Sequence, residues 1–397
     1  MLSKSMEALG RRRSVIREIF EYGNRRRAEI GADQVFDFSL GNPSVPPPSD
    51  VTEALLALLS DREPTALHGY TSAQGAPAVR GAIAEYIEKT FHFPARADLI
   101  YMTVGAAAAL TISLRALLAD GADEEVIVLT PFFPEYRVFI EAAGGKCVTA
   151  ACREPDFQID FASLDAAITE KTKAIIINSP NNPTGAVLKR ATLERLAERL
   201  RRAEAEYGHP IYLISDEPYR ELVYGDVEVP YLPKLYDDTI VSYSFSKSLS
   251  LPGERIGYIF VSPRAADADS VYAAILGAGR ALGFVCAPSL FQHLLPACLG
   301  KTSDIAVYRK NRDLLLSALT ECGFTCVPPD GAFYLFMKSP EPDAAHFAEV
   351  ARRHELLLVP SDDFGCPGYV RISYCVATET IERSLPAFRA LAKEYGL

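Results

Sequence analysis

The chain has 397 residues, of which 49% are hydrophobic and 23% charged, as is usual for a globular protein with a substantial core. Its 41 basic and 51 acidic side chains give a net charge of −10, which argues against a general nucleic-acid-binding protein. No apolar run reaches the roughly 18–20 residues of a transmembrane helix, so no membrane partner is expected.

The N-terminal segment, residues 1–48, carries arginine triplets at 11–13 and 25–27, with glutamates interspersed among them. Transit peptides are poor in acidic residues and secretory signals carry an apolar stretch, so neither is predicted and a cytoplasmic location is expected. The favoured interpretation of the triplets is the solvated basic face of an amphipathic helix. The proline-rich LGNPSVPPPSD (40–50) predicts extended chain, by which the segment would join a smaller domain.

Residues 49–288 are predicted to form a large α/β domain. Short apolar runs recur in it and alternate with helical segments such as 188–208. Strands that are apolar on both faces predict a mostly parallel central sheet covered by helices, with a ligand site beyond the carboxyl ends of the strands. The runs are EEVIVLT (124–130), KAIIINSP (173–180), IYLISDEP (211–218), DTIVSYSFS (238–246) and RIGYIFVS (255–262).

Residues 289–397 have the pattern of a smaller α+β domain. Three alternating or short apolar runs in it are flanked by helical segments: DGAFYLFM (330–337), LLLVPS (356–361) and YVRISYCV (369–376). The eight cysteines of the chain include no C-x-x-C pair, and its six histidines lack metal-type spacing. Buried thiols and no metal site are therefore expected.

Polar groups follow three of the predicted strands of the large domain. SPNNPTG (179–185) follows one strand, Asp216 ends the next, and Lys247 follows a third. Taken alone, 179–185 is a plain turn, since its Asn-Pro steps exclude regular helix. A carboxylate at the end of a buried strand needs a cation or a donor, so a structural ion pair between Asp216 and Lys247 is one interpretation.

The surroundings of Lys247 favour a bound anion instead. Ser244, Ser246 and Arg255 supply hydroxyl groups and a planar guanidinium, which suit a phosphate. Upstream, TVGAAAAL (103–110) is a turn of small residues entering a helix, whose backbone N–H groups and dipole attract anions. A packed, alanine-rich helix start explains that segment equally well.

A phosphate site, a reactive lysine and a carboxylate are together the parts that hold pyridoxal 5′-phosphate. The lysine forms an imine with its aldehyde, and the carboxylate keeps the ring nitrogen protonated so that the ring accepts electrons. With these residues in view, the chain resembles class I/II aminotransferases of the fold-type I, aspartate aminotransferase-like superfamily. Motifs in the order of that family run from end to end: GYTSAQGAPAVR, TVGAAAAL, PFFPEY, NSPNNPTG, SDEPY, SFSK, GERIG and YVRIS.

The resemblance implies a role for residues of each motif. Lys247, Asp216 and Tyr219 would be catalytic. Lys247 would hold the cofactor through its covalent bond. Its ring would be held by Asp216 at the nitrogen, by Tyr219 and Asn182 at the oxygen, and by Phe133 through stacking. Its phosphate would be bound by Ser244, Ser246, Arg255 and the backbone of Ala106 and Ala107. Tyr70 would reach the phosphate in the neighbouring subunit of a homodimer. Arg371 would bind the substrate α-carboxylate, helped by Asn182 and the backbone of Gly41.

Two departures from the family pattern bear on these roles. Many relatives stack a tryptophan on the cofactor, whereas this chain has none, so Phe133 of PFFPEY is expected to take that place. The helix start at 103–110 has alanines where relatives often have hydroxyls, which leaves phosphate binding there to backbone groups.

The implied activity is transfer of an amino group from an L-amino acid to a 2-oxo acid, such as 2-oxoglutarate, by a ping-pong mechanism. Aspartate, a related dicarboxylic amino acid and a neutral amino acid all stay open as the donor. One branch of aspartate aminotransferases binds the distal carboxylate with an arginine of the partner subunit. That arginine follows the cofactor lysine by about as many residues as Arg280 follows Lys247 here. An arginine that serves packing or surface charge is an equally good interpretation.

Three alternatives to a transaminase each fit part of the sequence. The same cofactor residues serve C–S β-lyases, which sequence hardly separates from transaminases. SFSK also fits the S-x-x-K pattern of penicillin-interactive serine enzymes, but the S-D-N and K-T-G boxes and an export signal are missing. A non-enzymatic aminotransferase-like sensor would need an N-terminal DNA-binding domain, for which the strand-rich core begins too early.

Overall fold

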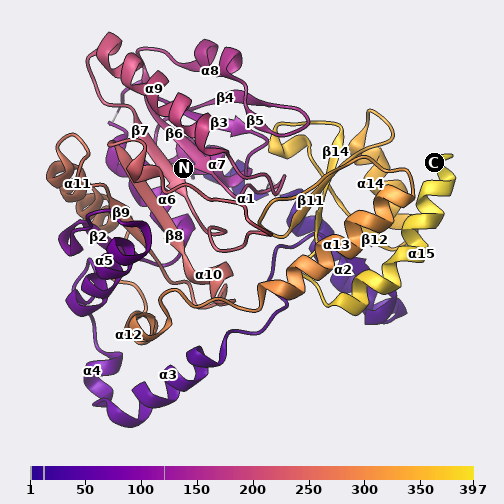
Figure 1. The fold of residues 1–397 in the computed structure, drawn as a ribbon, viewed down its shortest axis with the longest axis horizontal. Coiled ribbons are helices and arrows are strands. Elements are labelled where there is room, and N and C mark those ends of the chain that lie inside the picture. The colour runs from indigo at the N-terminus through magenta and orange to yellow at the C-terminus, as the bar shows by residue number, and fades with distance from the viewer. Residues whose placement is uncertain (1, 12–13, 120) are drawn as a thin grey trace.

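The computed structural model describes residues 2–11, 14–119 and 121–397. Within them, a central sheet of eight strands has the order β2-β9-β8-β7-β6-β3-β4-β5 (Figure 1). The strands β8, β7, β6, β3 and β4 run parallel to one another, whereas β9 and β5 run antiparallel to their neighbours. The strands are β2 (Ile100–Thr103), β3 (Glu125–Thr130), β4 (Lys146–Arg153), β5 (Gln158–Ile159), β6 (Thr172–Asn178), β7 (Tyr212–Asp216), β8 (Thr239–Ser244) and β9 (Gly257–Val261).

Helices cover both faces of this sheet. The helices in this part of the chain are α3 (Ser49–Asp61), α4 (Pro64–His68), α5 (Pro77–Phe91), α6 (Ala106–Leu117), α7 (Glu135–Ala142), α8 (Phe161–Ala167), α9 (Arg190–Tyr207), α10 (Phe245–Ser248), α11 (Ala268–Ala281) and α12 (Ser289–Cys298). Val126 and Val128 of β3 pack in the core with α6, α7 and α11, while Ile127 and Leu129 pack on the other side with α8 and α9. The predicted sheet, mostly parallel and covered on both faces, is confirmed.

A second, antiparallel sheet lies beside the first and in the described ranges has four strands, in the order β10-β11-β14-β13 (Figure 1). Its elements are β10 (Cys326–Val327), β11 (Tyr334–Lys338), β13 (Val359–Pro360), β14 (Tyr369–Ser373) and the helices α13 (Ile305–Glu321), α14 (Ala344–Arg353) and α15 (Thr378–Glu394). The three helices share one apolar core with this sheet, which includes Leu315, Phe347 and Phe388. A smaller α+β unit is therefore confirmed, whereas the boundaries 1–48, 49–288 and 289–397 stay predictions.

The N-terminal chain packs on this smaller unit. After α2 (Val15–Ile30), strand β1 (Phe36–Asp37) pairs in parallel with β12 (Leu356–Leu357). Arg26 forms an ion pair with Glu355 at 2.6 Å and Arg27 one with Asp37 at 2.8 Å. The interpretation of 25–27 as a solvated basic face is thus wrong for these two arginines, because the fold brings carboxylates to them. Arg12 and Arg13 of the first triplet lie outside the described residues.

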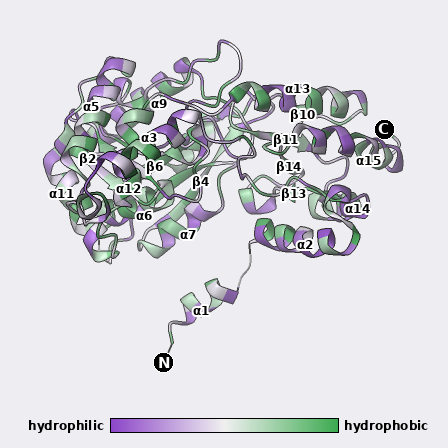
Figure 2. Cartoon of the chain, turned by 90° about the horizontal axis from the view of Figure 1, so that it is seen from below, coloured by the Kyte–Doolittle hydropathy of each residue, from purple (hydrophilic) through white to green (hydrophobic). Residues whose placement is uncertain are grey.

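Helix α1 (Lys4–Arg11) lies apart from the rest of the chain, and none of its residues is buried (Figure 2). The remaining short elements are 3-10 turns at Ala32–Gln34, Ala97–Leu99, Leu232–Lys234 and Asp362–Phe364. In the part of the chain that the structure describes, every helix is too short or too polar to cross a membrane.

Candidate active site

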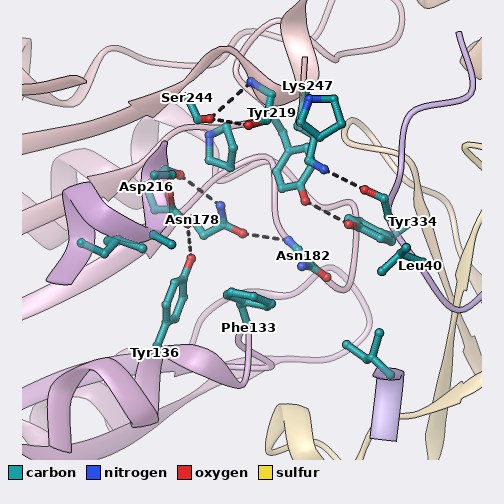
Figure 3. Close-up of a pocket in the computed structure, with 18 of the residues that line it drawn as sticks. Leu40, Phe133, Tyr136, Asn178, Asn182, Asp216, Tyr219, Ser244, Lys247 and Tyr334 are labelled. Carbon is teal, nitrogen blue, oxygen red and sulfur yellow. Dashed lines mark hydrogen bonds between the residues drawn. The ribbon is translucent and has the colours of Figure 1, made fainter. Parts of the chain in front are cut away.

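A cavity of about 280 Å³ opens where β6, β7 and β8 end, facing side chains of the smaller sheet. The last residues of these strands, Asn178, Asp216 and Ser244, line it together with Tyr334 of β11 and Arg371 of β14 (Figure 3). The site therefore lies at the carboxyl edge of the parallel strands, as expected for an open α/β sheet.

Most residues proposed from the sequence meet in this cavity. Those that line it are Gly41, Ala106, Ala107, Phe133, Asn182, Asp216, Tyr219, Ser244, Ser246, Lys247, Arg255 and Arg371. Tyr70 and Arg280 do not line it: Tyr70 is 93% exposed, and Arg280 is exposed near the end of α11. Any role of these two side chains in a neighbouring subunit stays a prediction.

Asp216 is a buried carboxylate, and only one of its two oxygens has a hydrogen-bond partner among the described residues. Tyr136 of α7 donates a hydrogen bond to Oδ2, whereas Oδ1 is buried without a hydrogen-bond partner among the described residues. Burial raises the pKa of Asp216 to about 7, and the hydrogen bond from Tyr136 opposes that rise. An unpaired, buried carboxylate oxygen that lines a cavity suits a protonated ring nitrogen.

The Asn178 side chain links the carboxyl ends of β6 and β7 to the loop that follows β6. Asn178 stands opposite Asp216 in the parallel register, and its amide donates to the Asp216 backbone oxygen at 3.0 Å. Its side-chain oxygen accepts from the backbone N–H of Asn182 at 2.8 Å. These bonds position the loop after β6, which carries Asn182 into the cavity.

Lys247 is held on α10, a single turn that directly follows β8. Its ammonium group donates to the backbone oxygen of Gly41 at 2.7 Å. Burial, together with the charges of the nearby Arg255 and Arg371, lowers the pKa of Lys247 to about 8. A lysine with a lowered pKa supplies a larger fraction of neutral, nucleophilic amine near neutral pH.

Hydroxyl and backbone donors gather at one end of the cavity. The hydroxyls of Ser244 and Ser246 lie 2.7 Å apart, and the N-terminus of α6 at Ala106 has no side-chain cap. A Cβ built on Gly105, which has φ +89°, would lie 2.9 Å from Arg255 Nη2, so the guanidinium sits directly against this helix start. Serine hydroxyls, a guanidinium and uncapped N–H groups together suit a phosphate.

Arg371 lies at the other end of the cavity and is 2% exposed. It donates to Asn182 Oδ1 at 3.0 Å and to the backbone oxygen of Ser39, and its Nε has no partner in the described ranges. The guanidinium stacks over Tyr334, 4.6 Å from the ring centre. Gly41 must be small here, since a Cβ on it would lie 2.0 Å from the Tyr334 hydroxyl.

Aromatic rings complete the walls. Phe133 lines the cavity, whereas Phe132 is buried in the core, which favours Phe133 as the stacking ring. Tyr219 shares a hydrogen bond of 2.9 Å with Tyr334. The sequence analysis missed Tyr136, Asn178 and Tyr334. A polar residue ending an apolar run was a signal for Asn178, and Tyr136 ends the motif PFFPEY, whereas Tyr334 carried no signal.

Comparison with known proteins agrees with this arrangement. The family model for aminotransferase class I and II matches residues 33–388. The chain belongs to the class I and II aminotransferase family. It is 32% identical to an aspartate aminotransferase of Pyrococcus abyssi, over 97% of both chains. A crystal structure of an aminotransferase from Eubacterium rectale is 51% identical over the full length of both chains, with a TM-score of 0.98. An aspartate aminotransferase of Thermus thermophilus solved with maleate is 28% identical over 98% of this chain and 100% of that one, with a TM-score of 0.86.

This aminotransferase is a transaminase that depends on pyridoxal phosphate, as its family does. Its cavity fits that cofactor on three counts. A lysine with a lowered pKa faces the cavity, a buried carboxylate oxygen there is unpaired within the described residues, and an uncapped helix start adjoins a guanidinium.

Proposed function

We propose that this aminotransferase transfers the amino group of an L-amino acid to a 2-oxo acid in two half-reactions, the first product leaving before the second substrate binds. One observation carries the proposal: Lys247, Asp216 and Arg371 face one cavity from the carboxyl ends of two neighbouring strands and from the smaller sheet. An amine, a carboxylate and a carboxylate-binding guanidinium are the groups that such a transfer needs.

Each side chain has a separate task in this proposal. Arg371 binds the substrate α-carboxylate through its planar fork, oriented by Asn182 and by stacking on Tyr334. Lys247 takes the proton from the substrate α-carbon and returns it on the cofactor side. Asp216 stays ionised beside the ring nitrogen, with Tyr136 stabilising its charge. Bound pyridoxal phosphate supplies the electron sink that makes the α-proton acidic.

The cofactor would be held by the remaining groups. Ser244, Ser246, Arg255 and the N-terminus of α6 would bind its phosphate, Tyr219 and Asn182 its ring oxygen, and Phe133 would stack on the ring. We further propose a homodimer in which Tyr70 completes the neighbouring site, and a cytoplasmic location. Because the relatives from Pyrococcus and Thermus are named aspartate aminotransferases, the acceptors to try first are 2-oxoglutarate, oxaloacetate and pyruvate.

A screen of amino donors against these three acceptors tests the activity, with Arg371→Lys as the key variant. Lysine cannot form the bidentate pair, so KM should rise ~100-fold for donors and acceptors alike. The matched control is Arg352→Lys, because the Arg352 side chain is half-buried, lies over Tyr22 and does not line the cavity. Release of pyruvate and ammonia from cystathionine without any oxo acid would instead indicate a C–S β-lyase.

A further inference from the structure

The cations of the cavity are all accounted for by the proposed function. Among the described residues that line it, the positively charged side chains are Lys247, Arg255 and Arg371. Lys247 serves the reacting carbon, Arg255 the phosphate and Arg371 the α-carboxylate. This leaves the chain's own wall without a cation for a second carboxylate on the substrate.

Apart from Arg255, the solvent-reaching part of that wall includes several hydrocarbon side chains. Leu40 precedes Gly41, which contacts the lysine, and its side chain lies beside Tyr334 while 40% exposed (Figure 3). Ile16, near the start of α2, and Phe139 of α7 also line the cavity and are partly exposed. Three separate segments thus bring apolar side chains to one cavity.

The two anchored ends of a bound amino acid determine where its side chain points. With the α-carboxylate on Arg371 and the α-carbon at Lys247, one end lies against a buried guanidinium and the other against a half-buried amine. The side chain must then extend toward the open side, where Leu40 adjoins the residue that contacts the lysine.

We propose that the amino donor has an apolar, uncharged side chain and that Ile16, Leu40 and Phe139 contact it. The inference rests on the proposed transaminase function and names its substrate class. A dicarboxylic donor would place its second carboxylate against these hydrocarbon groups, which supply no donor to replace its hydration. Removal of an aliphatic side chain from water at the same place makes the free energy of binding more favourable.

Arg280 is the competing explanation, since it would favour a dicarboxylic donor. It is exposed and does not line the cavity of its own chain. It could act only from a second subunit, so the test includes it.

The test uses the cofactor-loaded protein and two measurements. The first is kcat/KM for leucine and for aspartate, which are similar in size; we expect leucine to be preferred by at least ~50-fold. The second is calorimetric binding of two unreactive acids that lack the amino group, 4-methylpentanoate and succinate; we expect the first to bind ~10-fold tighter or more.

Alanine variants of two wall residues then test whether these side chains cause the preference for leucine. Leu40→Ala and Ile16→Ala should each lower kcat/KM for leucine by ~5–20-fold, with less than a ~2-fold effect on alanine, whose side chain is too short to reach the wall. Leu56→Ala is the matched control, because Leu56 is an exposed leucine of α3 outside the cavity, and it should leave the leucine-to-aspartate ratio unchanged.

Three outcomes would overturn the inference: aspartate turned over as well as leucine, succinate bound more tightly than 4-methylpentanoate, or Arg280→Ala abolishing turnover of aspartate alone. If no amino acid is converted, the proposed function fails. The relative affinities of 4-methylpentanoate and succinate would still show whether the wall prefers an apolar side chain.

Discussion

Tyr136 donates a hydrogen bond to one carboxylate oxygen of Asp216, while the other oxygen is buried without a partner in the described part of the chain. Burial is the main reason that the pKa of Asp216 is raised to about 7, and the hydrogen bond from Tyr136 opposes this rise. The phenol therefore helps to keep the carboxylate ionised at neutral pH, the form that can pair with a protonated ring nitrogen.

Removal of this hydrogen bond should weaken cofactor binding and catalysis together. In Tyr136→Phe the pKa of Asp216 should rise further, because a donor to its charged form is lost at a cost of about 1.5–3 kcal/mol. We expect ~10-fold or more loss in kcat and a higher dissociation constant for pyridoxal phosphate, measured by absorbance titration. The control is Tyr272→Phe, which removes a buried hydrogen bond to Ile100 at a distance from the cavity. Equal losses in both variants would contradict a specific role for Tyr136.

The lowered pKa of Lys247 should appear in the kinetics of cofactor capture. Only the neutral amine attacks the aldehyde, so capture by the cofactor-free protein should speed up ~10-fold per pH unit below about pH 8 and level off above it. Stopped-flow absorbance measures this rate. The reference reaction is capture by a free lysine derivative with a pKa of about 10.4, whose rate should keep rising to about pH 10. A protein rate that also climbed past pH 9 would show that burial does not lower this pKa.

A second acid, Glu221, has a buried carboxylate oxygen and should make stability depend on pH. Tyr243 donates to its Oε1 at 2.9 Å, and Oε2 is buried with no partner in the described ranges. Desolvation raises the pKa of Glu221 to about 7 in the folded protein, above its value of about 4.5 in the unfolded chain. Its contribution to stability is thus fully present below about pH 4.5, is lost as the pH rises through about 7, and is constant above that.

Glu221→Gln should remove this loss. Relative to wild type, the variant should gain about 2–3 kcal/mol in the free energy of unfolding between about pH 4.5 and pH 8, as measured by urea denaturation. The exposed Glu206, converted to glutamine, is the control and should show no such trend. A difference between Glu221→Gln and wild type that stayed constant with pH would rule out the raised pKa.

The proposed dimer predicts complementation between two inactive variants. Lys247→Ala lacks the amine of its own site, and Tyr70→Ala would lack the phosphate contact that it lends to its neighbour. Mixed, refolded or co-expressed at equal amounts, half of the dimers would be hybrid and hold one intact site, which restores about a quarter of wild-type activity. No recovery in hybrids isolated by two affinity tags would mean that Tyr70 does not act across subunits.

The carboxyl-edge part of the site was predictable because it depends on strand order alone. Apolar runs that end in a polar residue place Asp216 and Lys247 at the same edge once their strands are parallel neighbours. The resemblance to a family then assigned tasks to residues such as Arg371, on motifs that no periodicity would have singled out.

The tyrosines and the apolar wall were not predictable in this way. Tyr334 looks like an ordinary core residue, and the motif that contains Tyr136 does not show which group it contacts. Their partners are 80 and 115 residues away in sequence. Likewise Leu40 and Ile16 belong to an N-terminal chain that reaches the cavity only because β1 pairs with β12.

By itself, then, the sequence determined the sheet architecture and the cofactor class and proposed Lys247 as the reactive lysine, since these follow from local apolar patterns and from motifs at strand ends. The tertiary structure alone decided which phenol supports Asp216 and which apolar side chains line the cavity. The physical reason is that such contacts join segments far apart in the chain, and their distances are set by how the two sheets and the N-terminal helix pack together.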